Sequence, residues 1–383
     1  MIPKLVIVTE IIAPYRIPVF NALAQRPEVR LHVVFLSEND PTLRQWRVYK
    51  DEIRFQYDVL PSWRRRFGRY NVLLNGGVFA ALNKIAPDVL LCGGYNYVAS
   101  WQCAYWARRH RVALMLWSES TPFDRRRGRR LVEFLKSRFL GMCDAFVVPG
   151  KSAGEYLRSL AISERRIFTA PNAVDVGLFA ASAADARKNP AAVLARYSLP
   201  SRYFVYVGRL VRAKGIFDLL EAYGRLDEDV RAEVGLVFAG DGPDRSELIE
   251  RASQITTGAI QFPGFVHRED LPQLYALAEA LIFPTYSDTW GLVVNEAMSC
   301  SLPVITTSVA GCVADLVENN WNGFVISPGD VAQLASAMAR LAADSQLRRD
   351  MASRDRKRIE NYTPAAWAGG LVKAAEYLCG RNR

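Results

Sequence analysis

The sequence FPTYSDTWGLVVNEAMSCSLP, residues 283–303, has the pattern of a strand end, a polar turn and a helix. The apolar run 280–283 predicts a buried strand, and the glycine-containing turn 287–291 leads into helical spacing. A helix N-terminus presents unpaired N–H groups and the positive end of the helix dipole, which suits a phosphate. Asp288 lies on the turn and Glu296 one turn inside the helix, so both carboxylates can face one ligand. The stretch therefore predicts an anion-binding site.

Short apolar runs alternate with helical stretches along the chain, which is typical of doubly wound α/β domains. At 383 residues the chain exceeds the usual size of one hydrophobic core. We therefore predict an α/β fold with two doubly wound Rossmann-like domains that face each other across a cleft. The carboxyl ends of the strands should hold the ligand. The runs predicted as strands are 4–9, 31–36, 89–92, 113–117, 145–148, 203–207, 234–239, 260–262, 280–283 and 303–306.

The alternation breaks between Arg165 and Asn189, where an alanine-rich polar segment follows the sequence PNAVD. We place the domain boundary here, which defines an N-terminal domain of residues 1–171 and a C-terminal domain of residues 172–364. The last helical run follows a proline. We expect this segment, residues 365–383, to pack back on the first domain.

Charge is distributed unevenly between the two predicted domains. Residues 1–171 contain 27 Lys and Arg against 14 Asp and Glu, whereas residues 172–383 contain 22 against 25. Basic and apolar residues mix in the blocks 63–67 and 125–130, which fits an anionic membrane surface at about 1 kcal/mol per basic residue. Nucleic acid is not expected as a partner, because no zinc spacing, RNA-recognition signature or helix-turn-helix pattern is present. A solvated basic face is the open alternative.

The cysteines and the apolar runs indicate in which cellular compartment we expect the protein. The six cysteines show no paired spacing and lie mostly in apolar runs, as core residues do in a reducing compartment. The N-terminal apolar run is broken by Glu10 and fits a strand better than a signal peptide. The uncharged run 89–107 contains glycine and asparagine and fits a strand and helix better than a membrane span. We expect a cytoplasmic protein, peripheral on the inner face of the cell membrane.

Two cations follow another predicted strand. The run 203–207 ends in Gly208-Arg209, and Lys214 opens the next helical stretch. Fixed cations at the carboxyl end of a strand can clamp a diphosphate, with about 1.5 to 3 kcal/mol for each charge-assisted hydrogen bond. Taken alone, Arg209 or Lys214 is equally well explained as a solvated surface side chain.

Several such signals in one order resemble the retaining glycosyltransferases of family 4, which have the GT-B fold. The resemblance covers nearly the whole chain and is strongest between Pro171 and Gly329. It rests on PNAVD at 171–175, GRL at 208–210 with KG at 214–215, GDGP at 240–243, the stretch 288–298, NGF at 322–324 and, more softly, YRIP at 15–18 with Phe20.

The resemblance implies a role for each matching residue. Arg209 and Lys214 would neutralise the donor diphosphate as it leaves, Glu296 would bind the ribose, and Asp288 would bind the transferred sugar. Phe265 and Val266 would lie along the nucleobase. The implied donor-binding residues are Gly208, Phe265, Val266, Asp288, Thr289, Trp290, Gly291, Leu292 and Glu296.

The first domain would hold the acceptor, for which we propose Glu119 as a catalytic residue and Tyr15 and Arg16 as binding residues. A capping or loop-stabilising role is the alternative for Glu119. No metal cluster is apparent, and the fold does not usually need a metal or a further cofactor. The expected partners are a nucleotide-sugar donor and a glycan or lipid-linked acceptor.

The chain departs from the family at three places. The family usually has Glu where this chain has Asp288, which is one methylene shorter, so we expect a changed fit of the donor sugar. It commonly has Gly where this chain has Ser301, for which the sequence offers no account. The glycine-rich loop that often follows the first strand is replaced by residues 12–16, IAPYR.

The expected reaction is sugar transfer with retention of configuration. No carboxylate is well placed by sequence as a nucleophile, so we favour a same-face displacement in which the leaving phosphate helps to deprotonate the acceptor. Two alternatives stay open, a nucleotide-sugar epimerase and a non-enzymatic, membrane-bound nucleotide-sugar sensor.

Overall fold

A computed structural model describes residues 2–40, 46–67, 70–123 and 130–381. The chain divides into two compact units. Unit 1 consists of the residues up to Asn172 and the C-terminal segment from Thr363, and unit 2 consists essentially of Ala173–Tyr362. The basic block 125–130 lies outside the described residues except for its last member.

Unit 1 is built on a seven-stranded sheet in which every pair of neighbouring strands is parallel. The central strands are buried along most of their length, which explains their continuous apolar sequence. The strands, in their order across the sheet, are β3 (Gln56–Val59), β2 (Arg30–Phe35), β1 (Lys4–Thr9), β6 (Val89–Cys92), β7 (Ala113–Trp117), β8 (Ala145–Val148) and β9 (Ile167–Thr169).

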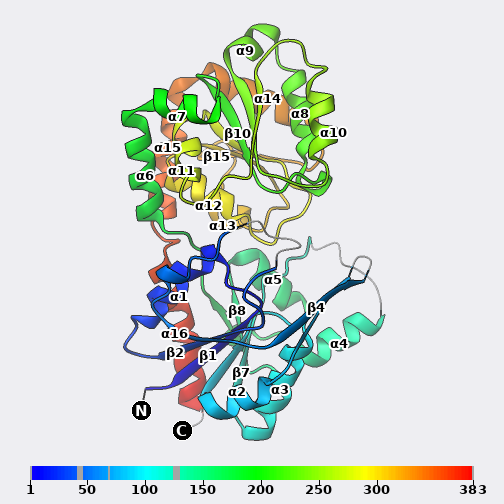
Figure 1. The fold of residues 1–383 in the computed structure, drawn as a ribbon, viewed down its shortest axis with the longest axis vertical. Coiled ribbons are helices and arrows are strands. Elements are labelled where there is room, and N and C mark those ends of the chain that lie inside the picture. Colours follow the sequence, from blue (N-terminus) through cyan, green and yellow to red (C-terminus); the bar gives the residue numbers. More distant parts are fainter. Residues whose placement is uncertain (1, 41–45, 68–69, 124–129, 382–383) are drawn as a thin grey trace. The chain divides into compact units, whose positions relative to one another are not determined.

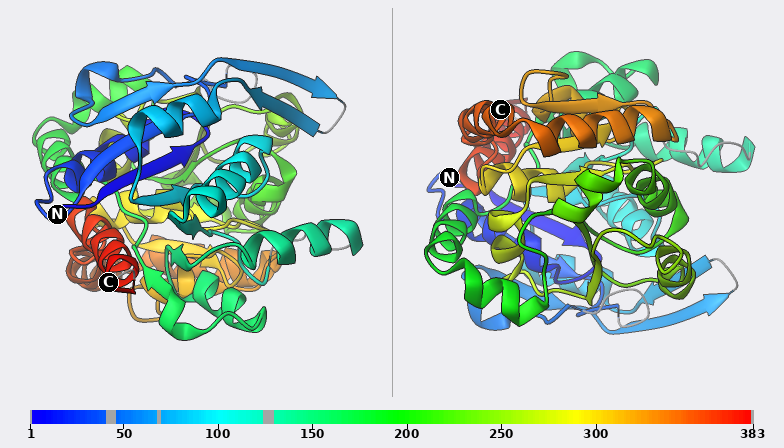
Figure 2. Two further views of the ribbon diagram at one scale, coloured as in Figure 1. Left: turned by 90° about the horizontal axis from the view of Figure 1, so that it is seen from below. Right: turned by 90° about the horizontal axis from the view of Figure 1, so that it is seen from above.

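Helices cover both faces of this sheet (Figures 1 and 2). One face packs on a core to which α2, α3, α4 and α5 contribute side chains. On the other face α16, red in Figure 1, lies beside α1, with Trp367 packed against Phe20 and Trp117. The helices are α1 (Ile17–Ala24), α2 (Val78–Ile85), α3 (Val98–His110), α4 (Arg130–Leu140), α5 (Lys151–Ser159) and α16 (Pro364–Arg381), with short 3-10 turns η1 (Pro14–Arg16), η2 (Lys50–Glu52) and η3 (Glu164–Arg166).

An antiparallel hairpin, β4 (Ser62–Phe67) and β5 (Tyr70–Asn75), extends beyond the body of unit 1 (Figure 2). The hairpin was not predicted, because its basic residues concealed the alternation of a strand. Its inner face contains Arg64, which pairs with Glu10 at 3.2 Å and with the buried Asp40 at 2.5 Å. Arg64 is therefore used internally and does not belong to an outward basic surface.

Unit 2 is built on a six-stranded parallel sheet with the order of a dinucleotide-binding fold. The strands, in their order across the sheet, are β12 (Ile260–Gly264), β11 (Gly235–Ala239), β10 (Tyr203–Val207), β13 (Ala280–Phe283), β14 (Val304–Thr307) and β15 (Gly323–Ile326). The strand order reverses between β10 and β13. The loops that follow these two strands therefore lie at the switch point where such sheets bind ligands.

The helices of unit 2 also divide between the two faces, each with its own hydrophobic core. They are α6 (Val176–Lys188), α7 (Pro190–Tyr197), α8 (Ile216–Gly224), α9 (Glu228–Glu233), α10 (Arg245–Ala252), α11 (Leu271–Leu277), α12 (Leu292–Ser299), α13 (Val313–Leu316), α14 (Val331–Ala343) and α15 (Ser345–Ile359), with the 3-10 turn η4 (Arg212–Lys214). The segment that broke the predicted alternation is itself helical, because Asp175 and Asn189 cap α6 and α7. Two parallel-sheet α/β units confirm the predicted fold class.

Candidate functional site

The helix terminus at the switch point of unit 2 is open. Gly291 precedes α12 with φ +98°, and no side chain caps the helix start. A Cβ at this position would lie 2.7 Å from the ring of Phe283, so glycine is required by both conformation and space. The N–H groups of Leu292 and Val293 are thereby left available to an anion, whereas that of Val294 bonds the carbonyl of Gly291.

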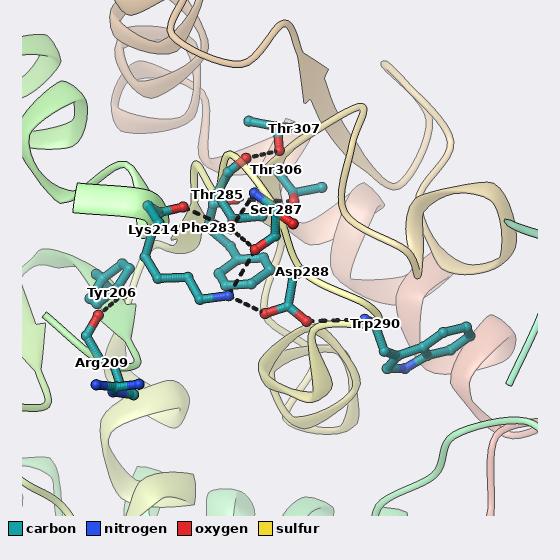
Figure 3. Close-up of polar contacts among 11 residues, drawn as sticks. Tyr206, Arg209, Lys214, Phe283, Thr285, Ser287, Asp288, Trp290, Thr306 and Thr307 are labelled. Carbon is teal, nitrogen blue, oxygen red and sulfur yellow. Dashed lines mark hydrogen bonds and ion pairs between the residues drawn. The ribbon is translucent and has the colours of Figure 1, made fainter. Parts of the chain in front are cut away.

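Lys214 and Asp288 meet in front of this terminus (Figure 3). The Nζ of Lys214 lies 2.6 Å from Oδ2 of Asp288 and donates a further hydrogen bond of 3.0 Å to the carbonyl of Ser287. The other carboxylate oxygen of Asp288 accepts the N–H of Trp290 at 3.0 Å. Asp288 thus uses one oxygen to order the turn and the other to hold Lys214.

The loop after β10 is fixed by backbone contacts. The buried Tyr206 donates a hydrogen bond of 2.8 Å from its hydroxyl to the carbonyl of Arg209. Gly240, on the neighbouring loop, could not carry a Cβ, because that atom would lie 1.9 Å from the carbonyl oxygen of Gly208. The Arg209 side chain is exposed and points away from the Lys214 contacts in Figure 3. Within the described residues its guanidinium has no carboxylate partner, unlike Lys214.

Glu296 lies half-buried on α12 beside Tyr275, whose hydroxyl donates a 2.7 Å hydrogen bond to it. Removal from water raises the pKa of Glu296 to about 7, while the Tyr275 hydrogen bond and Arg268 act in the opposite direction. One carboxylate oxygen is held by the protein, which leaves the other for a hydroxyl group.

The remaining predicted donor residues differ in exposure. Phe265 is exposed and packs edge to face on His267, so its ring can meet a flat ligand. Val266 belongs to the hydrophobic core, and only its backbone could line a ligand. Trp290 is buried and donates from its indole to Asn295 at 2.8 Å. Thr289 is partly exposed on the same turn. The side chains of Val266 and Trp290 therefore pack in the core beneath the site and are not exposed to contact a ligand.

In unit 1 the three predicted acceptor residues lie near one another. Arg16 pairs with Glu119 at 2.8 Å, and its guanidinium lies 3.8 Å from the ring centre of Trp117 and 5.5 Å from that of Tyr15. Asn172 donates to the same oxygen of Glu119 at 3.2 Å. Arg16 is consequently committed to an internal ion pair, and an acceptor phosphate would have to compete with Glu119 for it.

Three residues of these clusters were not anticipated from the sequence. Tyr275 and Trp117 lie inside apolar runs and have the appearance of core residues. Asn172 was quoted as part of a motif without a side-chain role. Tyr275 and Asn172 reach Glu296 and Glu119 only in the folded chain. Trp117 is two positions before Glu119, but its contact with Arg16 likewise appears only in the fold.

Metal ligands and membrane spans were sought in the described part of the chain. No group of three His, Cys, Asp or Glu side chains is placed to hold a metal ion among these residues. No helix over the same residues is sufficiently long and apolar to cross a membrane.

Two doubly wound units, one with a helix terminus and a cation at its switch point, define the class of GT-B glycosyltransferases. HepE of Anabaena, solved with UDP-glucose, shares this fold with a TM-score of 0.74 and 18% identity over 99% of this chain and 100% of that one. The family described as Glycosyltransferase Family 4 matches residues 20–178, and the family Glycosyl transferases group 1 matches residues 197–358. The chain belongs to the family 4 glycosyltransferases.

The sequence similarity to characterised relatives extends over about half of this chain. D-inositol 3-phosphate glycosyltransferase of Salinispora arenicola is 29% identical over 58% of this chain and 52% of its own length. O-antigen chain mannosyltransferase B of Escherichia coli is 32% identical over 41% of each chain. The chain thus spans about half, or less, of the length of these curated relatives.

Proposed function

We propose that the protein transfers a sugar from a nucleoside diphosphate sugar to a glycan or lipid-linked acceptor. The observation that carries this proposal is the meeting of Lys214 and Asp288 in front of the uncapped helix α12, at the switch point of a dinucleotide-type sheet. A diphosphate is the ligand that matches a helix N-terminus, a nearby lysine and the exposed Arg209.

The donor would lie along the carboxyl ends of β10 and β13. Glu296 takes the ribose, the N–H groups of the first turn of α12 take the diphosphate, and Phe265 lies along the base. The complexes of the Anabaena neighbour with UDP and UDP-glucose favour this class of ligand. Neither the base nor the sugar follows from the residues of the site.

The proposed reaction retains configuration and needs neither a metal nor a further cofactor. Lys214 and Arg209 stabilise the negative charge that develops on the leaving diphosphate, a task that a divalent cation performs in other sites. Both oxygens of Asp288 are engaged by Lys214 and by the N–H of Trp290, so Asp288 is poorly prepared to act as a nucleophile. A same-face displacement, in which the leaving phosphate accepts the acceptor proton, fits this arrangement.

Unit 1 is proposed to hold the acceptor beside Glu119. One oxygen of this carboxylate is held by Arg16 and Asn172, which leaves the other oxygen for an acceptor hydroxyl. Tyr15 presents an aromatic ring next to the same ion pair. The excess of basic residues in unit 1 supports an anionic membrane surface as the place where a lipid-linked acceptor is met, on the inner face of the cell membrane.

The clamp can be tested by replacing each cation separately. We expect Lys214→Ala and Arg209→Ala each to lower the rate of transfer by about 10- to 1,000-fold, since one or two charge-assisted hydrogen bonds in the transition state are lost. Arg212→Ala is the matched control, because Arg212 lies in the same loop but pairs outward with Glu247. Rates are measured on a panel of UDP- and GDP-sugars, with thermal melting to verify folding. Near-normal transfer rates in both the Lys214 and the Arg209 variant would contradict the proposed diphosphate clamp.

The same assay separates the two alternatives. An epimerase would release or convert the nucleotide sugar without an acceptor, and a sensor would bind the donor without turnover. A transferase consumes the donor in proportion to the glycosylated acceptor. Donor consumption is therefore measured with and without a lipid-linked acceptor.

A further inference from the structure

Helix α4 of unit 1 buries Phe139 and Leu140 against the core but also exposes three large apolar side chains. Val132, Phe134 and Leu135 are 50%, 61% and 41% exposed, whereas Lys136 on the same helix is only 7% exposed. The Lys136 ammonium is held by Glu133 and by the hydroxyl of Tyr156, both within 2.8 Å. A helix that buries its lysine and presents three large apolar residues is unusual for a surface in contact only with water.

The outward side of α4 also carries a cation. Phe134 and Arg138 are four residues apart and share one face of the helix, and Arg138 is exposed. In sequence the helix directly follows the basic block 125–130. Apolar side chains bordered by arginines are the composition of helices that lie in the interface of an anionic membrane.

The hairpin β4–β5 presents the same chemistry. Trp63 and Leu74 are directly opposite each other in the register and are 49% and 41% exposed. Arg65, two residues after Trp63, lies on the same outward face opposite Val72 and is exposed. The inward face instead holds Arg64 in its internal ion pairs. The hairpin therefore directs its tryptophan and one arginine outward.

Figures 1 and 2 show α4 and the hairpin projecting from the same side of unit 1. We infer that these two elements form a two-point anchor for an anionic lipid surface, with Trp63, Phe134 and Leu135 inserted and Arg65 and Arg138 at the headgroups. The inference rests on the proposed membrane-bound acceptor, for which it names the contact surface. An aromatic ring and an arginine at each point supply both the apolar and the electrostatic part of binding.

The test is flotation of the full chain with vesicles of phosphatidylglycerol and phosphatidylethanolamine, compared with phosphatidylcholine vesicles. We expect Trp63→Ser, and separately the pair Phe134→Ser and Leu135→Ser, to weaken partitioning by about tenfold or more. Leu178→Ser in unit 2 is the control, because Leu178 is an equally exposed single apolar residue, 47% exposed. The control should float with the wild type. Binding should also weaken at high salt.

Three results would overturn the anchor. The first is unchanged flotation of both variants, and the second is equal binding of the wild type to phosphatidylcholine vesicles. The third is a wild-type dimer in sedimentation that the same substitutions dissociate. Such a dimer would assign the surface to a second copy of the chain. Flotation needs neither donor nor acceptor, so it reports on the anchor even if transfer fails. Transfer to a water-soluble acceptor fragment should remain at the wild-type rate in the anchor variants. This control distinguishes loss of membrane binding from loss of catalytic activity.

Discussion

At the scale of single residues, Asp288 is expected to bind the transferred sugar, and it already has two partners within the protein. Its shorter side chain is engaged with Lys214 and with the N–H of Trp290, within the turn that precedes α12. A carboxylate in this place both orients Lys214 and repels the diphosphate that Lys214 is proposed to bind. We therefore expect Asp288 to act on the diphosphate through Lys214 as well as on the sugar.

Asp288→Asn separates these two effects. The amide can still accept the N–H of Trp290, but the negative charge near the diphosphate is lost. We expect the variant to bind UDP or GDP about tenfold more tightly, since the repulsion amounts to about 1 to 2 kcal/mol at an effective dielectric constant near 20. Transfer should nevertheless slow, because Lys214 loses its ion pair and keeps only the hydrogen bond to the carbonyl of Ser287. Titration calorimetry with the free nucleotides and steady-state rates measure the two effects.

Asp229→Asn is the control for this experiment, because it removes an exposed carboxylate from α9 of the same unit. Equal nucleotide affinity in Asp288→Asn and the wild type would mean that Asp288 acts on the sugar alone. The sequence could not reveal this pairing, since Lys214 and Asp288 are 74 positions apart. They meet because β10 and β13 are neighbours in the sheet, although two strands separate them in the chain.

At the scale of elements, the end of α12 explains the departure at Ser301. Ser301 adopts φ +57°, the left-handed conformation that favours glycine. The N–H of Ser301 bonds the carbonyl of Met298, and the N–H of Leu302 bonds that of Ala297. This is the Schellman arrangement, in which glycine is the common residue after the helix. The family's usual glycine thus has a conformational reason, and the site chemistry is not involved.

Ser301→Gly should consequently stabilise the protein. The left-handed conformation costs a residue with a Cβ about 1 to 2 kcal/mol, and the greater freedom of glycine in the unfolded chain offsets part of this gain. We expect a net increase of about 0.5 to 1 kcal/mol in the free energy of unfolding, with unchanged transfer rates. Denaturant titration measures it, with Ser301→Ala as the comparison that should give no increase. Destabilisation by glycine would show that the serine hydroxyl has a role of its own.

The elements that the sequence predicts best are the buried parallel strands. The runs 4–9, 89–92, 113–117 and 280–283 coincide with β1, β6, β7 and β13, because strands covered on both faces have continuous apolar sequences. The strands β3, β9 and β15 and the hairpin β4–β5 were missed. In the hairpin, Arg64 forms internal ion pairs whereas Arg65 lies on the opposite, outward face. The sequence of consecutive arginines does not distinguish these two faces.

At the scale of the whole molecule, unit 1 depends on residues from both ends of the chain. Trp367 of α16 is fully buried, with ring centres 5.2 Å from Trp117 and 5.7 Å from Phe20. The core that carries η1 and the Arg16–Glu119 pair is thus completed only by the C-terminal helix. Unit 2, in contrast, is formed essentially by one continuous stretch of chain, Ala173–Tyr362.

Trp367→Ala should therefore destabilise unit 1 selectively. Truncation of a buried tryptophan costs about 3 to 5 kcal/mol, which corresponds to a decrease of about 10 °C in the melting temperature of a unit of this size. Calorimetry with and without UDP should show a lowered transition for unit 1, while the nucleotide still raises the transition of unit 2 by its own binding energy. Glu376→Ala, at an exposed position of the same helix, should leave both transitions in place. If Trp367→Ala abolished the nucleotide-dependent shift, the two units would unfold as one, and nucleotide binding would then depend on α16 as well as on the loops after β10 and β13.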